Sequence, residues 1–291
     1  MNEPLVSVIV LTFNHEAFIE DCLNGILNQT YSNFEVIISD DHSEDGTFTV
    51  ISQLATGDDR IKVYKTEKNL GPAGNFQFAL SKSKGELISI CEGDDVWTNS
   101  LKLRLQVDEF RADQSTYLAY ANYCRIDAGG EILEASVLEG QPESFALGDL
   151  INNHGPATNS IMLRRNALPT ELPESFFSVL NPDVFIIGFA LKSGKAKYID
   201  QVLSAHRSHE SGIWSSKDKF ERGLHKYSTL VQLFKELKEK ELARQTLYLF
   251  ERQVILAKEN RNENFNRFFS ELPIRRRLLL RLKWRYRRLK R

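Results

Sequence analysis

The amino-acid sequence predicts an α/β fold with a mostly parallel central sheet flanked by helices, followed by a helical C-terminal extension. Short apolar runs rich in β-branched residues recur through the first hundred residues. Between these runs, apolar residues return at the spacing of a helix. From about Lys217 onward the pattern is helical throughout. Strands that alternate with helices favour a parallel sheet covered on both faces.

The first strand is expected at Leu5–Phe13, where LVSVIVLTF is almost entirely apolar. Further strands of this kind are predicted at Phe34–Ser39, Ile61–Tyr64 and Glu86–Cys91. Helices with one apolar face are predicted between the strands at Glu16–Asn28, Thr47–Ala55 and Asn75–Leu80. Right-handed crossovers then bring the loops after the strands to one edge of the sheet, where ligands of such folds bind.

Beyond residue 100 the pattern is looser. A helix is expected at Leu101–Phe110, and two strands, Tyr117–Ile126 and Ile132–Val137, flank a turn at residues 127–130. The remaining predicted elements are strands at Ser160–Leu163 and Ala196–Ile199 and a helix at Val184–Leu191.

Composition and missing motifs exclude several classes of protein. The chain of 291 residues is 42% apolar with a formal net charge of −1, which is typical of a globular protein and not of a disordered one. It has no run of 18 apolar residues, so we expect no membrane-spanning helix. The three cysteines are far apart, which favours buried free thiols over disulfides. Neither G-x-x-x-x-G-K-[ST] nor a G-x-G-x-x-G after a strand occurs.

Acidic residues follow two of the predicted strands. Asp40 and Asp41 come after the second strand, and Glu92-Gly93-Asp94-Asp95 follows the strand ELISIC. In a parallel sheet both groups fall at the same edge, where carboxylates held close together repel one another unless a cation or hydrogen-bond donors join them. Hard oxygen ligands favour Mg²⁺ or Mn²⁺. The alternative is that these acids form turns and helix caps.

Two segments resemble family 2 glycosyltransferases, which have the GT-A fold and invert the transferred sugar. These segments are VSVIVLTFNHEAFIEDCLNGILNQTYSNFEVIISDDHSEDGT and EKNLGPAGNFQFALSKSKGELISICEGDDVW. The resemblance is close over roughly residues 4–110 and looser over 155–215, and the order and spacing of the motifs make it specific.

The resemblance implies a set of residues that bind the nucleotide-sugar donor. Thr12 and Asn14 stand at the start of the nucleotide pocket, and Asp41 is expected to read the donor base, as a carboxylate that accepts the N3–H of uracil. A turn or cap is the alternative for Asp41. Residues expected to pass under the donor are Asn69, Gly71 and Asn75. At Gly74 many relatives carry an arginine, so a contact from that position is missing.

The acidic loop resembles the family's D-x-D element, which holds a divalent metal, Mn²⁺ or Mg²⁺, against the donor diphosphate. Asp94 is expected to hold the metal with Asp95 beside it, while Glu92 replaces the usual first aspartate and its role stays open. His206-Arg207-Ser208-His209 resembles a late R-x-H element, in which Arg207 would pair with phosphate and His209 would reach the metal or the diphosphate. A surface loop is the alternative.

Asp183 is the candidate catalytic base, because inverting transfer needs a carboxylate that takes the proton of the acceptor hydroxyl. The family places an acid at the start of a helix, and Asn181-Pro182-Asp183 stands before an apolar helix here. Pro followed by Asp is also an ordinary helix start. On the acceptor side, the resemblance points more weakly to Thr158, Ser160 and Trp214, with a structural role as the alternative.

The last 17 residues, RRRLLLRLKWRYRRLKR (275–291), hold ten basic residues and no acid. Leucines and Trp284 share one face of this segment, which favours a helix lying on an anionic membrane surface. A solvated basic tail or a nucleic-acid patch is the alternative. We divide the chain into a glycosyltransferase domain, 1–214, and a helical extension, 215–291. The first comprises a nucleotide-sugar half, 1–110, and an acceptor half, 111–214.

Together these features predict a metal-dependent inverting glycosyltransferase that moves a sugar from a nucleoside-diphosphate sugar, UDP-linked, to a hydroxyl of a glycan or lipid-linked acceptor. Bacterial surface polysaccharide synthesis fits such an acceptor. The expected location is cytoplasmic and peripheral at the inner face of the cell membrane, with no nucleic-acid partner. The alternative is a non-catalytic nucleotide-sugar binding protein tethered to the membrane surface, which Glu92 and Gly74 leave open.

Overall fold

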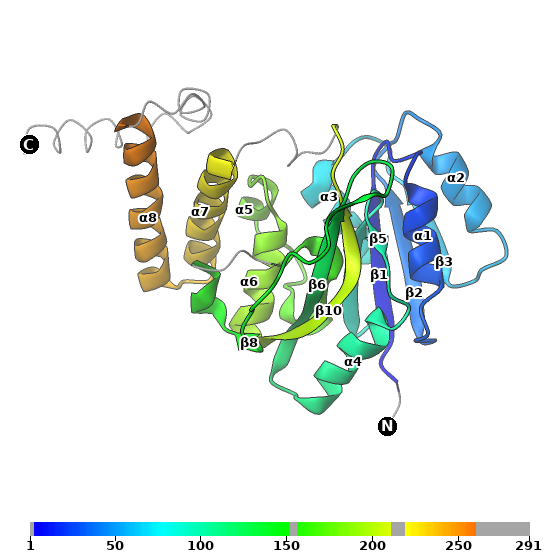
Figure 1. Cartoon of the computed structure of the whole chain (residues 1–291), viewed down its shortest axis with the longest axis horizontal. Helices are drawn as coiled ribbons and strands as arrows, with labels where there is room; N and C mark the ends of the chain where they lie inside the picture. Colours follow the sequence, from blue (N-terminus) through cyan, green and yellow to red (C-terminus); the bar gives the residue numbers. More distant parts are fainter. Residues whose placement is uncertain (1–2, 152–155, 211–218, 260–291) are drawn as a thin grey trace, which may run out of the picture.

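The computed structural model describes residues 3–151, 156–210 and 219–259 (Figure 1). In this part of the chain ten strands form one sheet, with β3-β2-β1-β4-β9-β6-β10-β5 as its main path. The strands are β1 Val6–Thr12, β2 Phe34–Asp40, β3 Ile61–Lys65, β4 Leu87–Glu92, β5 Val96–Trp97, β6 Thr116–Ile126, β7 Ile132–Glu134, β8 Ser144–Phe145, β9 Ile161–Arg164 and β10 Lys195–Arg207. The helices are α1 Ile19–Leu27, α2 Thr47–Leu54, α3 Gly71–Lys82, α4 Lys102–Ala112, α5 Glu174–Phe177, α6 Asp183–Ser193, α7 Lys219–Glu236 and α8 Lys240–Glu259, with short 3₁₀ turns η1 Leu147–Ile151, η2 Thr158–Ser160 and η3 Arg165–Ala167.

The sheet is mostly parallel, as the sequence predicts. β1 pairs in parallel with both β2 and β4, β2 pairs in parallel with β3, and β6 pairs in parallel with β10. Strand β9 runs antiparallel between β4 and β6, so these two neighbours again share one direction. The carboxyl ends of six strands on the main path therefore lie at one edge of the sheet.

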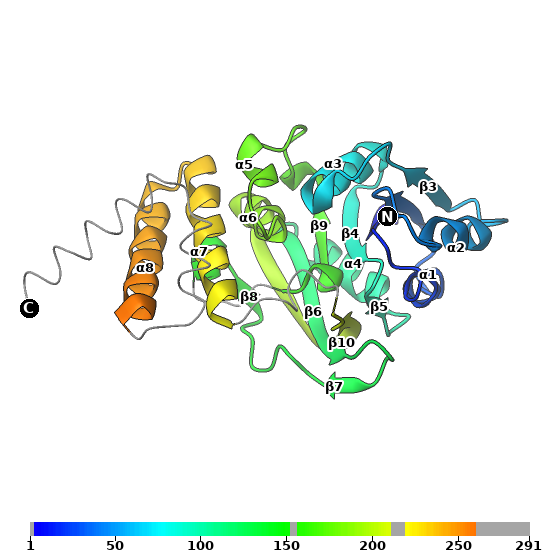
Figure 2. The ribbon, with the colours of Figure 1, turned by 90° about the horizontal axis from the view of Figure 1, so that it is seen from above.

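Helices cover both faces of the sheet (Figure 2). Successive residues of β1 point to opposite sides: Val8 and Val10 pack with α1, α2 and α4, whereas Ile9 packs with α3 and α6. Because both faces are buried, the strands need apolar residues at nearly every position. This explains why the sequence shows unbroken apolar runs there instead of alternation.

Several elements differ in extent from the prediction. β10 spans 13 residues instead of ending at Ile199, because bulges around Val202 carry it past the polar pair Asp200-Gln201. β5 and β8 have two residues each, too few to show a pattern. α3 begins at Gly71, ahead of the predicted Asn75, since a proline is well tolerated in the first turn.

Helix α6 runs opposite to the strands on which it packs. It ends at Ser193, and Lys195, which starts β10, donates its N–H to the carbonyl oxygen of Ser115 just before β6. The C-terminus of α6 thus lies at the amino edge of these strands. Because 11 residues of helix rise about 16 Å, its first residue, Asp183, lies toward the carboxyl edge.

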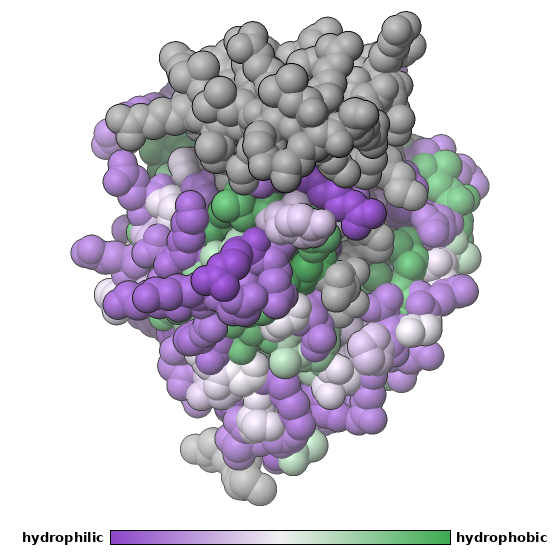
Figure 3. Space-filling view, turned by 90° about the vertical axis from the view of Figure 1, so that its left-hand side faces the viewer, coloured by the Kyte–Doolittle hydropathy of each residue, from purple (hydrophilic) through white to green (hydrophobic). Residues whose placement is uncertain are grey.

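The helices α7 and α8 extend this core at one end of the molecule (Figure 1). Leu230, Leu233 and Phe234 are fully buried and join the cluster that includes α6. Seen from this end, the described surface is largely hydrophilic with smaller apolar patches (Figure 3). None of the described helices has the length and apolarity that crossing a bilayer demands. The proposed boundary at 214/215 and the basic tail 275–291 lie outside the described residues.

Candidate functional site

The loop Glu92–Asp95 leaves the carboxyl end of β4 and packs against the end of β1. Gly93 donates its N–H to the carbonyl oxygen of Leu11 at 2.8 Å. A Cβ atom at Gly93 would lie 2.9 Å from both the Thr12 side chain and Nδ1 of His15. Glycine is therefore required for the two loops to approach this closely, and the approach brings the acids beside Thr12 and His15.

The two carboxylate oxygens of Asp94 differ in their contacts. His209 Nε2 lies 2.9 Å from Asp94 Oδ2, and His15 Nε2 lies 3.9 Å from the same atom. Asp94 Oδ1 is buried and has no hydrogen-bond partner among the described residues. Although burial opposes ionisation, the His209 hydrogen bond and the His15 charge hold the pKa of Asp94 below its usual range. Asp94 is thus ionised and offers a free oxygen to a cation.

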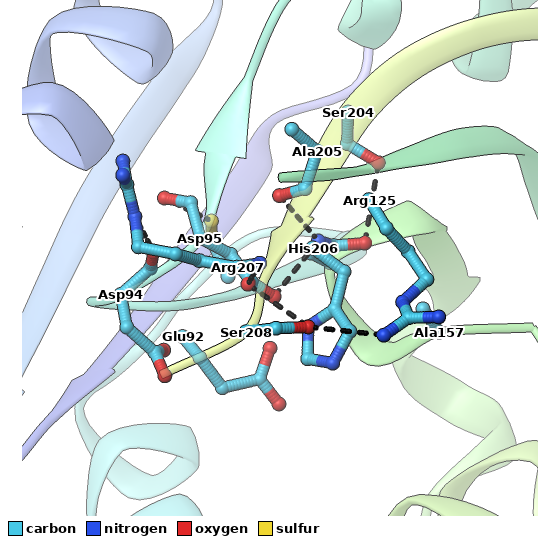
Figure 4. A network of polar contacts seen from close by, with 12 residues as sticks. Glu92, Asp94, Asp95, Arg125, Ala157, Ser204, Ala205, His206, Arg207 and Ser208 are labelled. Carbon is cyan, nitrogen blue, oxygen red and sulfur yellow. Dashed lines mark hydrogen bonds and ion pairs between the residues drawn. The ribbon is translucent and has the colours of Figure 1, made fainter. Parts of the chain in front are cut away.

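Asp95, by contrast, has partners on both carboxylate oxygens (Figure 4). Its Oδ1 accepts the backbone N–H of Arg207 at 2.8 Å and lies 3.1 Å from His206 Nδ1. Its Oδ2 accepts a hydrogen bond from Asn159 Nδ2 at 2.8 Å. Burial raises the pKa of Asp95. Burial lowers the pKa of His206, but the hydrogen bond to Asp95 outweighs this and raises the pKa of His206 to about 9. The structure places Asp95 as an anchor for β10, and its direct metal contact stays a prediction.

Glu92 lies on the α3/α6 face, since Ile88 and Ile90 of the same strand point there. Burial, followed by the charges of Asp95 and Asp94, raises the pKa of Glu92 to about 8. A hydrogen bond from Thr158 opposes that shift, and Oε2 has no partner among the described residues. Glu92 therefore carries a proton at neutral pH unless a cation approaches.

The unpartnered oxygens of Asp94 and Glu92 fit a divalent cation that arrives with phosphate. No group of three or more His, Cys, Asp or Glu side chains in the described ranges is arranged to hold a metal by itself. One or two protein carboxylates with water and phosphate oxygens are, however, a common shell for Mg²⁺. The described residues thus offer two carboxylate oxygens to such a cation and do not form a closed protein cage.

Asp41 is buried at the start of α3, where it accepts hydrogen bonds from the backbone N–H groups of Leu70 at 2.7 Å and Gly71 at 2.9 Å. Burial raises the pKa of Asp41. Asn69 Oδ1 accepts the same Gly71 N–H at 2.9 Å, and Gly71 has a φ of +74°, which glycine adopts easily. Asp41 therefore caps the start of α3. Its recognition of the donor's nucleobase stays a prediction.

The other donor-side residues connect the loops. Asn14 takes a left-handed φ of 56°, donates its N–H to Ser43 Oγ and accepts the N–H of Glu44 at Oδ1. Asn75 is buried, with its amide oxygen and nitrogen both bonded to Ser39. It therefore ties α3 to β2. Thr12 Oγ1 is buried and has no partner among the described residues.

Arg207 braces the acidic loop with a guanidinium that is already engaged. It donates to the carbonyl oxygens of Asp94 at 2.9 Å and Ala128 at 3.1 Å and to Asp21 Oδ2 at 3.2 Å. The guanidinium also stacks 5.0 Å from the centroid of the Phe18 ring. These contacts join α1, the β6–β7 turn and the loop after β4, and the predicted phosphate contact stays a prediction.

Asp183 starts α6 and is half-buried. Burial raises its pKa to about 6, although the amides of its own first turn favour the charged form. Asp183 therefore begins a helix and also has a raised pKa, and it lies toward the carboxyl edge of the sheet.

The predicted acceptor-side residues have different partners. Thr158 bonds to Glu92, whereas Ser160 Oγ donates back to the Ala157 carbonyl oxygen. Trp214 lies outside the described residues.

Three residues of this network were missed by sequence reasoning as site residues: His15, Asn159 and His206. His15 and His206 lie within motifs quoted above, and Asn159 lies between Thr158 and Ser160, so each stands next to a residue that was singled out. For Asn159 and His206, nothing in one sequence tells which neighbour turns toward the acids, because that depends on β10 pairing with β5 and on η2 packing against β4 and β10.

The fold and the acid-lined edge place the protein in the GT-A class of α/β folds. Its structure is similar to that of Staphylococcus aureus TarS 1–349 in complex with UDP-GlcNAc (TM-score 0.64, 19% identity, covering 93% of this chain and 76% of that one). It is also similar to the mannosyltransferase PcManGT of Pyrobaculum calidifontis in complex with GDP-Man and Mn²⁺ (TM-score 0.59, 18% identity, covering 89% and 76%).

The chain belongs to glycosyl transferase family 2, whose family model matches residues 7–170. It is 29% identical over 224 residues to the Escherichia coli UDP-Glc:alpha-D-GlcNAc-diphosphoundecaprenol beta-1,3-glucosyltransferase WfgD, covering 75% of this chain and 83% of that protein. It spans 61% of the length of uncharacterized mycobacterial relatives that it also matches.

Proposed function

We propose that this protein is an inverting glycosyltransferase. It moves a sugar from a nucleoside-diphosphate sugar, UDP-linked, to a hydroxyl of a glycan or lipid-linked acceptor in bacterial surface polysaccharide synthesis. The observation that carries the proposal is the unpartnered, ionised carboxylate oxygen of Asp94 at the carboxyl edge of β4. Membership of family 2 and the printed activity of WfgD support the reaction, and the TarS complex with UDP-GlcNAc supports the donor.

The donor diphosphate would lie over the loop after β4. Asp94, with Glu92 and His209 beside it, would hold Mn²⁺ or Mg²⁺, and the PcManGT complex with Mn²⁺ supports such a cation. A bound cation offsets the charge that grows on the leaving diphosphate. Asp95 and Arg207 keep this loop in place through β10. A rigid loop is needed because electrostatic stabilisation requires preorganised groups.

Asp183 would act as the base. Its raised pKa of about 6 leaves it ionised at neutral pH, yet makes it a better proton acceptor than an ordinary aspartate. It takes the proton of the acceptor hydroxyl as that oxygen attacks the anomeric carbon. The bond to the diphosphate breaks on the opposite face, so the anomeric centre inverts. Glu92, on the sheet face that α6 covers, would stand between donor and base.

The acceptor would approach from the η2 side, where Thr158 and Ser160 stand, with Trp214 closing the site. The proposed location is cytoplasmic, at the inner face of the membrane, with the tail 275–291 on anionic lipid. A lipid-linked acceptor supports this location, because its sugar stays within reach of the membrane surface. The acceptor printed in the name of WfgD is of that kind.

The test is a transfer assay with purified full-length protein, UDP-glucose or UDP-GlcNAc, Mn²⁺ and a GlcNAc-diphospholipid acceptor. We expect UDP release and a new glycoside, with its anomeric configuration read by NMR, and a rate lower by about 10²–10⁴ for Asp183→Asn. A retained configuration would overturn the inverting mechanism. Binding of UDP without turnover of any donor would instead favour the non-catalytic alternative.

A further inference from the structure

Two basic side chains lie next to each other on β6 and β10, beyond the acidic loop. Arg125 and His206 are register partners in the parallel pairing of these strands. Partners in neighbouring strands have Cα atoms about 5 Å apart and side chains on the same face. Figure 4 shows the Arg125 guanidinium and the His206 ring side by side. Both side chains are partly exposed, 42% for Arg125 and 39% for His206.

The His206 ring is held in one orientation. Its Nδ1 faces Asp95 Oδ1 at 3.1 Å, and Asp95 is itself fixed by Asn159 and by the backbone N–H of Arg207. With Nδ1 turned inward, Nε2 points away from Asp95 on the exposed side of the ring. An oriented imidazole of this kind has one nitrogen available to a ligand.

The guanidinium of Arg125 is only partly engaged in its contacts with Ser208 and Glu134. Its Nη2 donates to Ser208 Oγ at 3.3 Å, and its Nη1 lies 3.6 Å from Glu134 Oε2. The Glu134 side chain is well exposed, and exposed ion pairs of this length contribute little. A guanidinium has five N–H donors in a fork that matches phosphate oxygens, so a phosphate can bind without breaking a strong internal contact.

The pair lies on the acceptor side of the sheet. In the strand order, the donor-side loops follow β1 and β2, while β6 and β10 lie beyond β4 and β9. Tyr123, two residues before Arg125, packs against the core shared with α3 and α6. Arg125 and His206 therefore share the face on which Glu92 and Asp183 lie, but on the other side of the acidic loop from Asp41.

We infer that Arg125 and His206 bind the phosphate of a diphosphate-linked acceptor and so select acceptors whose sugar is attached to a diphosphate. This inference rests on the proposed function, because the proposed function assigns the donor diphosphate to Asp94 and so leaves Arg125 and His206 for the acceptor. Two separate anion sites then flank the acidic loop, one for each substrate. The pair positions the acceptor and takes no part in breaking or forming bonds.

The test is calorimetric titration of the full-length protein, saturated with UDP and Mg²⁺, with octyl diphosphate as the probe and octyl glucoside as the uncharged comparison. Arg125→Gln removes the guanidinium. His206→Asn keeps a nitrogen near the Nδ1 position, and so the bond to Asp95, while it removes Nε2. The matched control is Arg244→Gln, which breaks an exposed pair with Glu241 on α8.

We expect octyl diphosphate, but not octyl glucoside, to bind the wild type and the control equally, and about tenfold or more weakly to Arg125→Gln and His206→Asn. UDP affinity should be the same in all four proteins, and each should unfold cooperatively. No binding to the UDP-loaded wild type, or equal binding to every variant, would overturn the inference. A matching loss of UDP affinity in Arg125→Gln would reassign the pair to the donor and also overturn it.

Failure of the proposed function would be seen in the UDP affinity of the wild type and not in the comparison of the variants. If the wild type binds no UDP, the donor assignment is wrong. The octyl diphosphate titration of the nucleotide-free protein and its variants then still reports whether Arg125 and His206 form a phosphate site.

Discussion

Asn159 holds Asp95 in place: its Nδ2 donates to Asp95 Oδ2 at 2.8 Å and to the Ala205 carbonyl oxygen at 3.1 Å. The carbonyl oxygen of Asn159 also accepts the indole N–H of Trp97 at 3.1 Å, and Ser204 Oγ donates to its Oδ1. One buried residue therefore connects β5, β10 and η2 around the acidic loop, its main-chain carbonyl bonding β5 and its side-chain amide bonding Asp95 and β10.

Replacing this amide should destabilise the fold. Asn159→Ala leaves Asp95 with one oxygen unpaired in the interior, and an unsatisfied buried acceptor costs about 1–3 kcal/mol, more when charged. We expect the free energy of unfolding in urea to fall by at least that amount. Asn24→Ala, at an exposed position of α1, is the control and should change it by less than about 0.5 kcal/mol. Equal stability of the two variants would show that the connection is dispensable.

The second prediction concerns the carboxylate of Asp94. Titration of UDP into the wild type should show affinity that drops when EDTA removes Mn²⁺, because Asp94 is ionised and its Oδ1 has no partner among the described residues. Asp94→Ala should bind UDP weakly and with no response to EDTA. Asp108→Ala, an exposed acid on α4, should behave as the wild type. UDP affinity that ignores both EDTA and Asp94→Ala would rule out a cation at this loop.

The third prediction is a pH dependence set by Asp183. A base must be deprotonated to act, and burial raises its pKa to about 6. We expect kcat/KM to be constant above neutrality and to fall tenfold per pH unit well below pH 6, whereas an ordinary aspartate would sustain activity down to about pH 4. Asp183→Asn should lower kcat by about 10²–10⁴ while leaving UDP affinity intact. Undiminished activity at pH 5 would contradict the assignment.

Lys102 leads to a fourth prediction, on stability. It is fully buried, with Nζ 2.8 Å from Gln106 Oε1 and 4.1 Å from the Trp97 ring, and burial lowers its pKa from 10.5 to about 7. The unfolded chain binds the proton more tightly, so this group's contribution to stability rises with pH between 7 and 10.5, by up to about 5 kcal/mol.

Urea unfolding of wild type and Lys102→Met at several pH values isolates this effect. The stability of Lys102→Met relative to the wild type should be greatest near pH 7 and should decline as the pH rises, because methionine keeps the volume and removes the proton. A difference that does not vary with pH would mean that Lys102 titrates normally. The matched control is Lys62→Met, unfolded in urea at the same pH values. Lys62 pairs with Glu35 near the surface.

The fifth prediction concerns the basic tail. Removal of residues 275–291 should lower binding to phosphatidylglycerol vesicles by tenfold or more in a sedimentation assay, since each basic residue near such a surface adds about 1 kcal/mol. Raising the salt concentration should weaken binding of the full-length protein. UDP affinity should be unaffected by the truncation. Equal sedimentation with neutral phosphatidylcholine vesicles would argue against an electrostatic membrane contact.

The sequence by itself determined the frame of this protein. β1 to β4 and the helices between them could be predicted because each strand is a local apolar run, and each helix shows its period within a dozen residues. The motifs around Asp41 and Asp94 marked the edge at which the site lies, because strand ends of a parallel sheet meet there.

Only the tertiary structure distinguished Asp94 from Asp95. The two acids are adjacent in the chain, but β10 and η2 bring donors to both oxygens of Asp95, whereas Asp94 Oδ1 has no donor within the described part of the chain. In the same way, Arg207 braces the loop, because its partners come from α1 and the β6–β7 turn. Such roles depend on contacts between residues far apart in the chain, and these contacts exist only after β9, β6 and β10 have joined the sheet.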